Sequence, residues 1–145
     1  MDAMSPVERG WLAHGYTRSP AAGPFVPAIA RIFQRQEGAQ RRFRVEVTAQ
    51  HCNGGGRGHG GFIAMLADVW LAAALADQLA PAARFVTASL QVDFLEAVRP
   101  GDCLESAIDW LRPGSRLCQA SGRICAGGRP VAAMRGVFAI LTPVP

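Results

Sequence analysis

The chain has 145 residues, of which 50% are hydrophobic and 18% charged, so it is suited to one folded domain and not to a disordered chain. Its net charge is +4 and all 15 basic residues are arginines, which can grip phosphate and favour an anionic ligand, but they form no dense run of the kind that binds nucleic acid. No uncharged apolar run reaches the roughly 20 residues of a membrane span, and the first residues do not resemble a signal peptide. We therefore expect a cytoplasmic protein that contacts neither membrane nor nucleic acid.

Residues 1–27 are predicted to be a lead-in, with a short helix from Ser5-Pro6 to Trp11, because serine caps helices and proline fits the first turn. The prolines that follow Ser19 are expected to break any regular element. Residues 28–145 are predicted to form a single domain. It should begin with two strands, 28–36 and 40–47, joined by a turn at Glu37-Gly38-Ala39.

A glycine-rich run over 53–61 leads into an apolar segment over 62–79 that is too long for a strand and rich in Ala and Leu. We interpret it as one helix, apolar on almost every side and therefore wrapped by other structure. Strands are then expected at 86–94, where apolar and polar residues alternate, and at 104–111, 117–125 and 131–141. The predicted class is α+β, with an antiparallel sheet of five to six strands wrapped around one long central helix.

Asp68 lies in the middle of that helix, between Leu66-Ala67 and Val69-Trp70. A carboxylate among such neighbours is costly unless it is paired, hydrated or used in chemistry. The residues alone leave two interpretations open: a functional acid, or a side chain that faces solvent or an arginine. Asp77, near the end of the helix, is predicted to be only solvated.

The start of the helix is the second candidate feature. Gly58, Gly60 and Gly61 leave the backbone free to approach a ligand, and the first amides of a helix are unpaired and favour negative charge. That suits an oxygen that becomes an oxyanion, although a flexible loop before a helix would give the same sequence. Because Gly60 and Asp68 are roughly 12 Å apart along the axis, both can act on one carbonyl only if two subunits share each site, which predicts a symmetric dimer.

His51, Cys52 and His59 lack a further carboxylate or thiol at useful spacing, so we expect neither a metal site nor a resident cofactor. A nucleophilic pair of Cys52 and His59 stays open on composition alone. The four cysteines form no C-x-x-C pair, and reduced, buried thiols are expected.

Together these motifs resemble a known family. The motifs are Asn53, His59-Gly60-Gly61, Leu66-Ala67-Asp68, the strand 86–95, and Arg99-Pro100-Gly101-Asp102. From about Phe25 to Leu141 the chain resembles the PaaI-like acyl-CoA thioesterases, hotdog-fold members of the 4-hydroxybenzoyl-CoA thioesterase superfamily. The resemblance implies a homodimer or homotetramer that needs no metal.

The same resemblance implies a role for each matching position. Asp68 matches the acid that attacks the thioester or activates water to do so, and Gly60 the residue whose backbone amide polarises the carbonyl. His59 and Asn53 match side chains that orient the thioester or the water, and Thr87 falls where some relatives have a hydroxyl that assists the water. The run Gly54–Gly58, with Arg57, is richer in glycine than is usual there, which puts the substrate in doubt rather than the mechanism.

For an acyl-CoA substrate, four arginines beside turns are candidates for contact with the nucleotide phosphates: Arg84, Arg99, Arg112 and Arg116. Each is equally well an ordinary solvated arginine. Two other functions stay open, a non-catalytic acyl-CoA-binding module and a hotdog hydratase or dehydratase. The sequence does not identify the acyl group. Phe62, Trp70 and Phe94 are candidates to line an aromatic pocket, but large apolar residues at such positions are more often part of the core.

Overall fold

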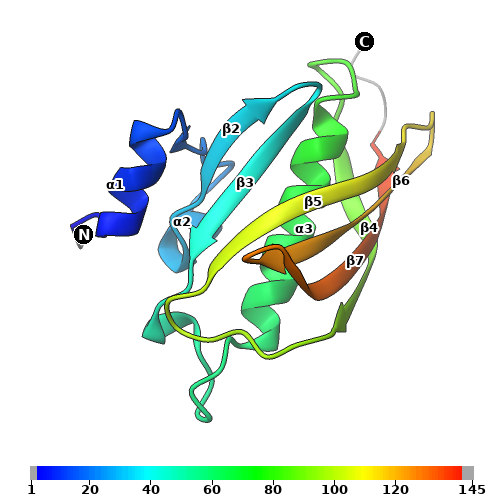
Figure 1. Ribbon diagram of the computed structural model, residues 1–145. Helices are drawn as coiled ribbons and strands as arrows, with labels where there is room; N and C mark the ends of the chain where they lie inside the picture. Colours follow the sequence, from blue (N-terminus) through cyan, green and yellow to red (C-terminus); the bar gives the residue numbers. More distant parts are fainter. Residues whose placement is uncertain (1–2, 142–145) are drawn as a thin grey trace.

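A computed structural model describes residues 3–141, so the first two residues of the predicted lead-in and the last four of the predicted domain lie outside the described part. The elements in chain order are α1 (Pro6–Ala13), β1 (Thr17–Arg18), α2 (Phe25–Ile29), β2 (Phe33–Glu37), β3 (Gln40–Glu46), the short 3₁₀ turn η1 (Ala49–His51), α3 (Gly60–Ala76), β4 (Phe85–Phe94), β5 (Cys103–Arg112), β6 (Leu117–Ala126) and β7 (Arg129–Ile140) (Figure 1). No helix among these combines the length and the hydropathy needed to cross a membrane.

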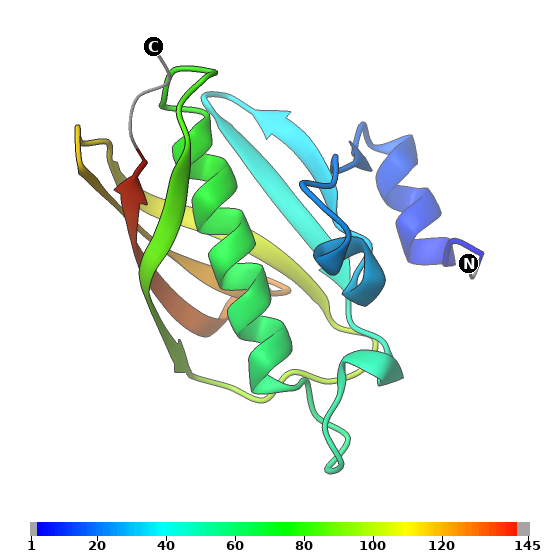
Figure 2. The ribbon, with the colours of Figure 1, turned by 180° about the vertical axis from the view of Figure 1, so that it is seen from behind.

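One antiparallel sheet holds all the described strands, in the order β1-β2-β3-β5-β6-β7-β4. It curves around α3, which lies against its concave face (Figures 1 and 2). The predicted α+β arrangement of a sheet around one long helix is therefore confirmed. The predicted count of five to six strands is wrong, because β1 adds a seventh strand by pairing Thr17 with Gln34. Two residues are too few to show the alternating pattern by which the other strands were predicted.

The lead-in packs on the sheet and is more regular than expected. The predicted first helix is confirmed: Ser5 Oγ accepts from the Glu8 amide at 3.1 Å, and the Glu8 carboxylate accepts from the Ser5 amide at 2.9 Å. The prediction of a strand from residue 28, with irregular chain before it, is wrong, because α2 forms there with Pro24 as its N-cap. Pro27 is tolerated because it lies in the first turn, where backbone N–H groups have no partner within a helix.

Helix α3 begins two residues earlier and ends three residues earlier than predicted. At its start His59 is the N-cap, and its ring Nδ1 accepts from the Gly61 amide at 2.9 Å. At its end Asp77 is the C-cap and binds Arg41 Nε at 2.7 Å. The prediction that Asp77 is only solvated is therefore wrong.

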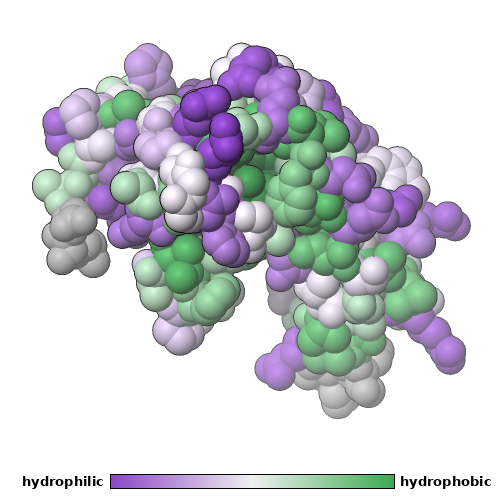
Figure 3. All heavy atoms as spheres, turned by 90° about the horizontal axis from the view of Figure 1, so that it is seen from below, coloured by the Kyte–Doolittle hydropathy of each residue, from purple (hydrophilic) through white to green (hydrophobic). Residues whose placement is uncertain are grey.

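One side of α3 is left partly uncovered by the chain, so the prediction of a helix wrapped all round is wrong for a single copy. The residues of that side are half-buried or exposed: Ala64, Met65, Asp68, Val69, Ala72, Ala73 and Ala76. Seen from below, the rear of the molecule is hollowed between two projecting lobes, and hydrophobic side chains reach the surface on both (Figure 3). The hollow is the place where a ligand or a second chain can reach the helix.

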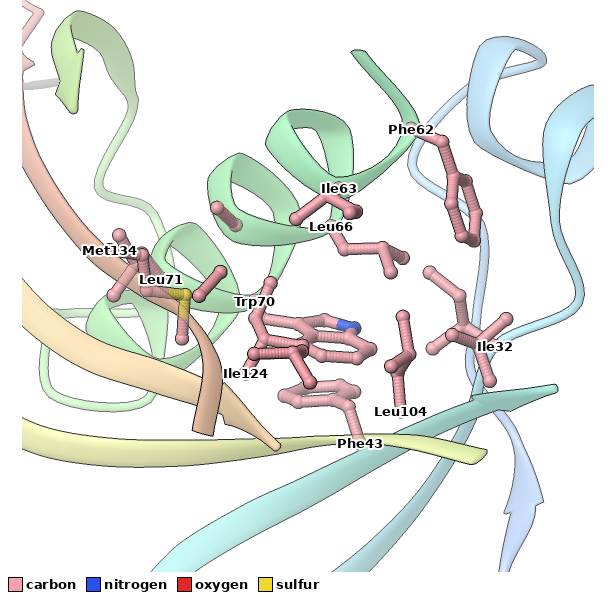
Figure 4. Packing of buried hydrophobic residues seen from close by; sticks show 14 of the residues in the cluster. Ile32, Phe43, Phe62, Ile63, Leu66, Trp70, Leu71, Leu104, Ile124 and Met134 are labelled. Carbon is pink, nitrogen blue, oxygen red and sulfur yellow. The ribbon is translucent and has the colours of Figure 1, made fainter. Parts of the chain in front are cut away.

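The other side of α3 forms the core. Trp70 is fully buried and stacks on Phe43 of β3, with ring centroids 6.2 Å apart, and Leu66 and Leu104 pack beside it (Figure 4). Truncating a buried leucine such as Leu66 to alanine typically costs about 2–5 kcal/mol of stability. Trp70 is thus a core residue, the more common of the two interpretations that the sequence left open for it.

Candidate active site

Asp68 and Thr87, which are far apart in the sequence, meet where α3 faces the edge strand β4. Thr87 Oγ1 donates to Asp68 Oδ1 at 2.6 Å. A β-bulge between Thr87 and Ser89 shifts the register of β4 against β7 at this point, and such bulges re-aim neighbouring side chains. Within residues 3–141, the second carboxylate oxygen of Asp68 has no hydrogen-bond partner, so it is free to act on a ligand.

The start of α3 presents donors rather than an acid. Because His59 Nδ1 accepts the Gly61 amide at 2.9 Å, the neutral ring carries its proton on Nε2 and can donate it outward. The Gly60 amide has no partner within the described residues, as expected for the first residue of a helix. The ring of Phe94 lies beside Gly60, since a Cβ on Gly60 would stand 3.4 Å from Phe94 Cζ.

The glycine-rich loop before α3 is held by hydrogen bonds rather than being loose. Asn53 Oδ1 accepts from the amides of Gly55 at 2.9 Å and Arg57 at 3.2 Å. The Gly58 amide donates to Val98 O at 2.7 Å, and a Cβ at Gly58 would stand only 2.9 Å from the Val98 side chain, so glycine is required there. With its oxygen engaged, the Asn53 side chain still has the two N–H donors of its amide nitrogen.

His51 is a structural residue beside the candidate site. Its ring stacks on Phe62 with centroids 4.2 Å apart. Its Nδ1 accepts from the Thr48 amide at 3.0 Å, and its Nε2 donates to Ile29 O at 2.8 Å. Burial lowers the pKa of His51 below its usual range, against a smaller opposite effect of the bond to Ile29. The neutral ring therefore ties α2 to the start of α3, a role that the sequence did not suggest.

The other open interpretations of these residues find little support in the geometry. No group of three or more His, Cys, Asp or Glu side chains within residues 3–141 is arranged to hold a metal ion. Cys52 Sγ donates to Thr48 O at 3.5 Å, whereas the His59 ring faces the Gly61 amide. The structure therefore does not bring Cys52 and His59 together as a nucleophilic pair.

Two hollows flank α2 and divide the candidate residues between them. The N-terminal hollow, of about 390 Å³, is lined by Phe25, Ile29, Gln50, His51, Cys52, His59, Gly61, Phe62 and Met65. The carboxylate groove, of about 520 Å³, is lined by Asp68 and by Val69, Ala72, Ala73 and Ala76 of α3, by Arg18–Ala22, Val26, Pro27, Ala30 and Ile32, and by Arg41, Phe43 and Phe85. One copy of the chain thus keeps the His59 ring and the Asp68 acid in separate hollows.

The sequence did not predict that the lead-in forms a wall of the carboxylate groove, because Pro24 and Pro27 were expected to break any regular element. The signal was present, since a proline in a first turn is compatible with a helix. Phe62, predicted for a pocket, does line the N-terminal hollow.

The four candidate arginines do not lie together in one copy. Three of them lie at the end of the sheet beside the C-terminus of α3, where they flank β4, β5 and β6: Arg84, Arg112 and Arg116. Two backbone hydrogen bonds hold this end together, since Arg84 O accepts from Leu141 N at 2.9 Å and Arg116 O accepts from Ile140 N at 2.8 Å. Arg99 lies in the connection from β4 to β5 at the opposite end, where its amide donates to Asp102 Oδ2 at 2.9 Å. The two ends are separated by the length of α3, roughly 25 Å.

Comparisons with known proteins identify the family of the chain. Residues 47–139 match the family model of the acyl-CoA thioesterase N-terminal domain. A Pseudomonas aeruginosa protein, PA0474, whose name ascribes an esterase activity to it, is 39% identical over 119 residues, which are 81% of this chain and 88% of that protein.

Solved structures share the fold. The PaaI protein of the E. coli phenylacetic acid degradation operon superimposes with a TM-score of 0.66 at 25% identity, over 78% of this chain and 81% of its own. A thioesterase of Streptococcus pneumoniae solved with coenzyme A gives a TM-score of 0.69 at 17% identity, over 79% of this chain and 91% of its own. The predicted hotdog fold and PaaI-like resemblance are thereby confirmed.

Proposed function

The chain belongs to the acyl-CoA thioesterase family of the hotdog fold, and on that premise we propose that it hydrolyses an acyl-CoA at a site built around Asp68. The observation that carries the proposal is the Asp68 carboxylate at the border of an apolar groove, with one oxygen held by Thr87 at 2.6 Å and the other free. Such an acid is oriented for attack without being neutralised by a cationic partner.

In the proposed reaction the thioester carbonyl oxygen faces the Gly60 amide and His59 Nε2, which donate to it as negative charge develops. Asp68 either attacks the carbonyl carbon itself or takes a proton from a water molecule that attacks. The C–S bond breaks, coenzyme A leaves as the thiol, and one water is consumed to form the free acid. Asn53 and Thr87 orient the water and the carboxylate. This chemistry uses no metal and no cofactor.

The proposed site needs two copies of the chain. Gly60 and Asp68 of one copy lie roughly 12 Å apart along α3, and α2 separates the hollow lined by His59 from the groove lined by Asp68. An antiparallel pair of α3 helices would set the His59-Gly60 turn of one copy against the Asp68 of the other, twice per dimer. The β4 edge supports this assembly, because Val86 to Ser89 are exposed and the outer side of β4 has no strand neighbour in the described chain. A tetramer made of two such dimers would hold the same sites.

The same two-fold arrangement bears on coenzyme A. In the proposed dimer, the two copies run in opposite directions along α3. The partner's Arg99 therefore comes toward the end of the sheet that holds Arg84, Arg112 and Arg116. We propose these arginines as the contacts of the nucleotide phosphates, since guanidinium groups bind phosphate in pairs.

The experiment is thiol release from short, long and aromatic acyl-CoAs by the wild type and by Asp68→Asn. Asp109→Asn is the control, because Asp109 is an exposed carboxylate paired with Arg123 at 2.8 Å. We expect Asp68→Asn to keep its circular dichroism spectrum and to lose activity by about a thousandfold, and Asp109→Asn to lose none. Near-normal turnover by Asp68→Asn would remove Asp68 from the mechanism.

Two further readouts separate the alternatives. Coenzyme A binding in calorimetry without thiol release would favour the binding module, and loss of enoyl-CoA absorbance would favour a hydratase. A single turnover in heavy-oxygen water labels Asp68 if its own oxygen attacks, and labels only the product acid if it activates water.

A further inference from the structure

Resting on the proposed function, we propose that the carboxylate groove holds the acyl group along α3 and selects medium-length, apolar acyl chains of about eight to ten carbons. The groove has the volume of a small-ligand site, about 520 Å³, within the usual range of roughly 300–1,000 Å³. Asp68 lies at one end of the groove. The acyl group of a thioester attacked by Asp68 needs space beside that acid, and the groove is the space that adjoins it.

Both walls of the groove are apolar over most of their length. On α3, the residues Val69, Ala72, Ala73 and Ala76 follow Asp68 along one face, and the three alanines leave room where larger residues would close it. The facing wall comes from α2 and the chain beside it, with Val26, Ala30 and Ile32. An alkyl chain is stabilised between such walls by the removal of its surface from water.

The polar groups of the lining are already engaged, so they offer little to a polar acyl group. Ser19 Oγ donates to Gln34 Oε1 at 3.2 Å. The Arg18 guanidinium lies over the Phe33 ring, 5.7 Å from its centroid. Apart from Asp68, the remaining charged group of the lining is Arg41, which is also paired.

Arg41 marks the far end of the groove. It donates to both carboxylate oxygens of Asp77, at 2.7 and 2.8 Å, and to Ala73 O at 3.2 Å. A longer acyl chain would have to separate this ion pair or strip it of water, which is costly. The pair therefore closes the apolar path at the level of Ala73 to Asp77.

The length of that path sets the chain length. Asp68 and Ala76 are eight positions apart, roughly 12 Å along the helix axis. An extended alkyl chain advances about 1.25 Å per carbon for C–C bonds of about 1.52 Å. The space from the acid to the ion pair therefore accommodates about eight to ten carbons.

The test compares kcat/KM for acyl-CoAs from butyryl to tetradecanoyl in the wild type, Ala72→Phe and Ala76→Phe. Ala13→Phe is the control, because Ala13 is an exposed alanine of α1 outside the groove. Each methylene buried in the groove is worth about fourfold in kcat/KM. We expect the wild type and Ala13→Phe to be best with eight to ten carbons. Measured against butyryl-CoA in the same variant, Ala76→Phe should lose decanoyl-CoA by about tenfold or more, and Ala72→Phe should lose hexanoyl-CoA and longer substrates.

A further variant is expected to extend the range of accepted acyl chains rather than shorten it. Asp77→Ala removes the closing ion pair and should raise tetradecanoyl-CoA turnover relative to decanoyl-CoA by severalfold. Loss of all chain lengths alike in both phenylalanine variants, or an unchanged length profile in all three groove variants, would overturn the inference. Failure of the proposed function is a different result, since the wild type would then hydrolyse none of the substrates.

Discussion

The two hollows beside α3 are neighbours in space but differ in chemistry. The N-terminal hollow is lined by His59, the N-cap of α3, and by the buried, neutral His51. The carboxylate groove is apolar along α3 and has its acid at one border. One hollow is thus suited to stabilising negative charge, and the other to holding an alkyl chain and an attacking oxygen.

On the proposed function, this difference means that one copy of the chain carries two separate halves of the active site. The helix itself enforces the separation, because its rigid backbone holds Gly60 and Asp68 roughly 12 Å apart. The halves become complementary only when two copies are combined.

The largest expected effect comes from removing the amide of Gly60 without disturbing the helix. Proline is favoured at a first helical position and lacks the N–H, and His59 before it has the extended conformation that proline requires, with ψ 133°. We expect Gly60→Pro to lower kcat by about 10²–10³-fold. Gly60→Ala keeps the amide and places its Cβ at an ordinary 3.4 Å from Phe94, so it should stay within a few-fold of the wild type; equal activity of the two variants would mean that the amide does not act.

Mixing two inactive variants tests whether the halves come from different copies. In a dimer of Asp68→Asn with Gly60→Pro, one site would pair the intact Asp68 of one copy with the intact Gly60 of the other. Random exchange should restore about a quarter of wild-type activity, since half the dimers are mixed and each has one whole site. No recovery after verified subunit exchange would place both groups in one copy and contradict the division into halves.

A smaller effect is expected in the carboxylate groove when the partner of Asp68 is removed. Thr87→Val deletes the hydroxyl that donates to Asp68 at 2.6 Å and keeps the size of the side chain. A hydrogen bond to a charged group is worth about 1.5–3 kcal/mol, so kcat should fall by about tenfold or somewhat more. Thr87→Ser, which keeps the hydroxyl, should be close to the wild type, and a loss as large as that of valine would point to packing instead.

The smallest effect is on stability and belongs to the N-terminal hollow. Because the pKa of His51 is lowered by burial, the unfolded chain takes up a proton below about pH 6.5 that the folded chain resists. Stability should therefore fall as the pH drops below about 6.5, at up to about 1.4 kcal/mol per pH unit, until the folded pKa is reached. Urea unfolding between pH 5 and 8 should show this slope in the wild type and in the exposed-site control His14→Gln, but not in His51→Gln.

The fold was largely predictable from the sequence, because the helix and most strands have clear periodicity. Alternation located β4, and the long Ala- and Leu-rich segment located α3 to within three residues. The elements that were not predicted include the two-residue strand β1 and the helix α2. The five residues of α2 follow Pro24 and include Pro27, and they carry too little pattern to outweigh these prolines.

The residues proposed for the site were named from the sequence alone, but their geometry could not be. The spacing of Gly60 and Asp68 already led to the expectation of a dimer if both groups act on one carbonyl, since helix rise is fixed. The contact of Thr87 with Asp68 depends on a bulge in β4 that no local sequence rule determines. The second wall of the groove could not be predicted, because it depends on how the lead-in packs across the domain.

The exposed β4 edge has a consequence for the enzyme in dilute solution. If the active unit is a pair of chains joined there, catalytic competence follows mass action rather than the number of folded chains. Specific activity would then fall when the protein is diluted below the dissociation constant of the pair, and would return on concentration or when a bound acyl-CoA bridges the two copies. The specific activity of such a protein would be controlled by its own concentration, with no effector and no covalent modification.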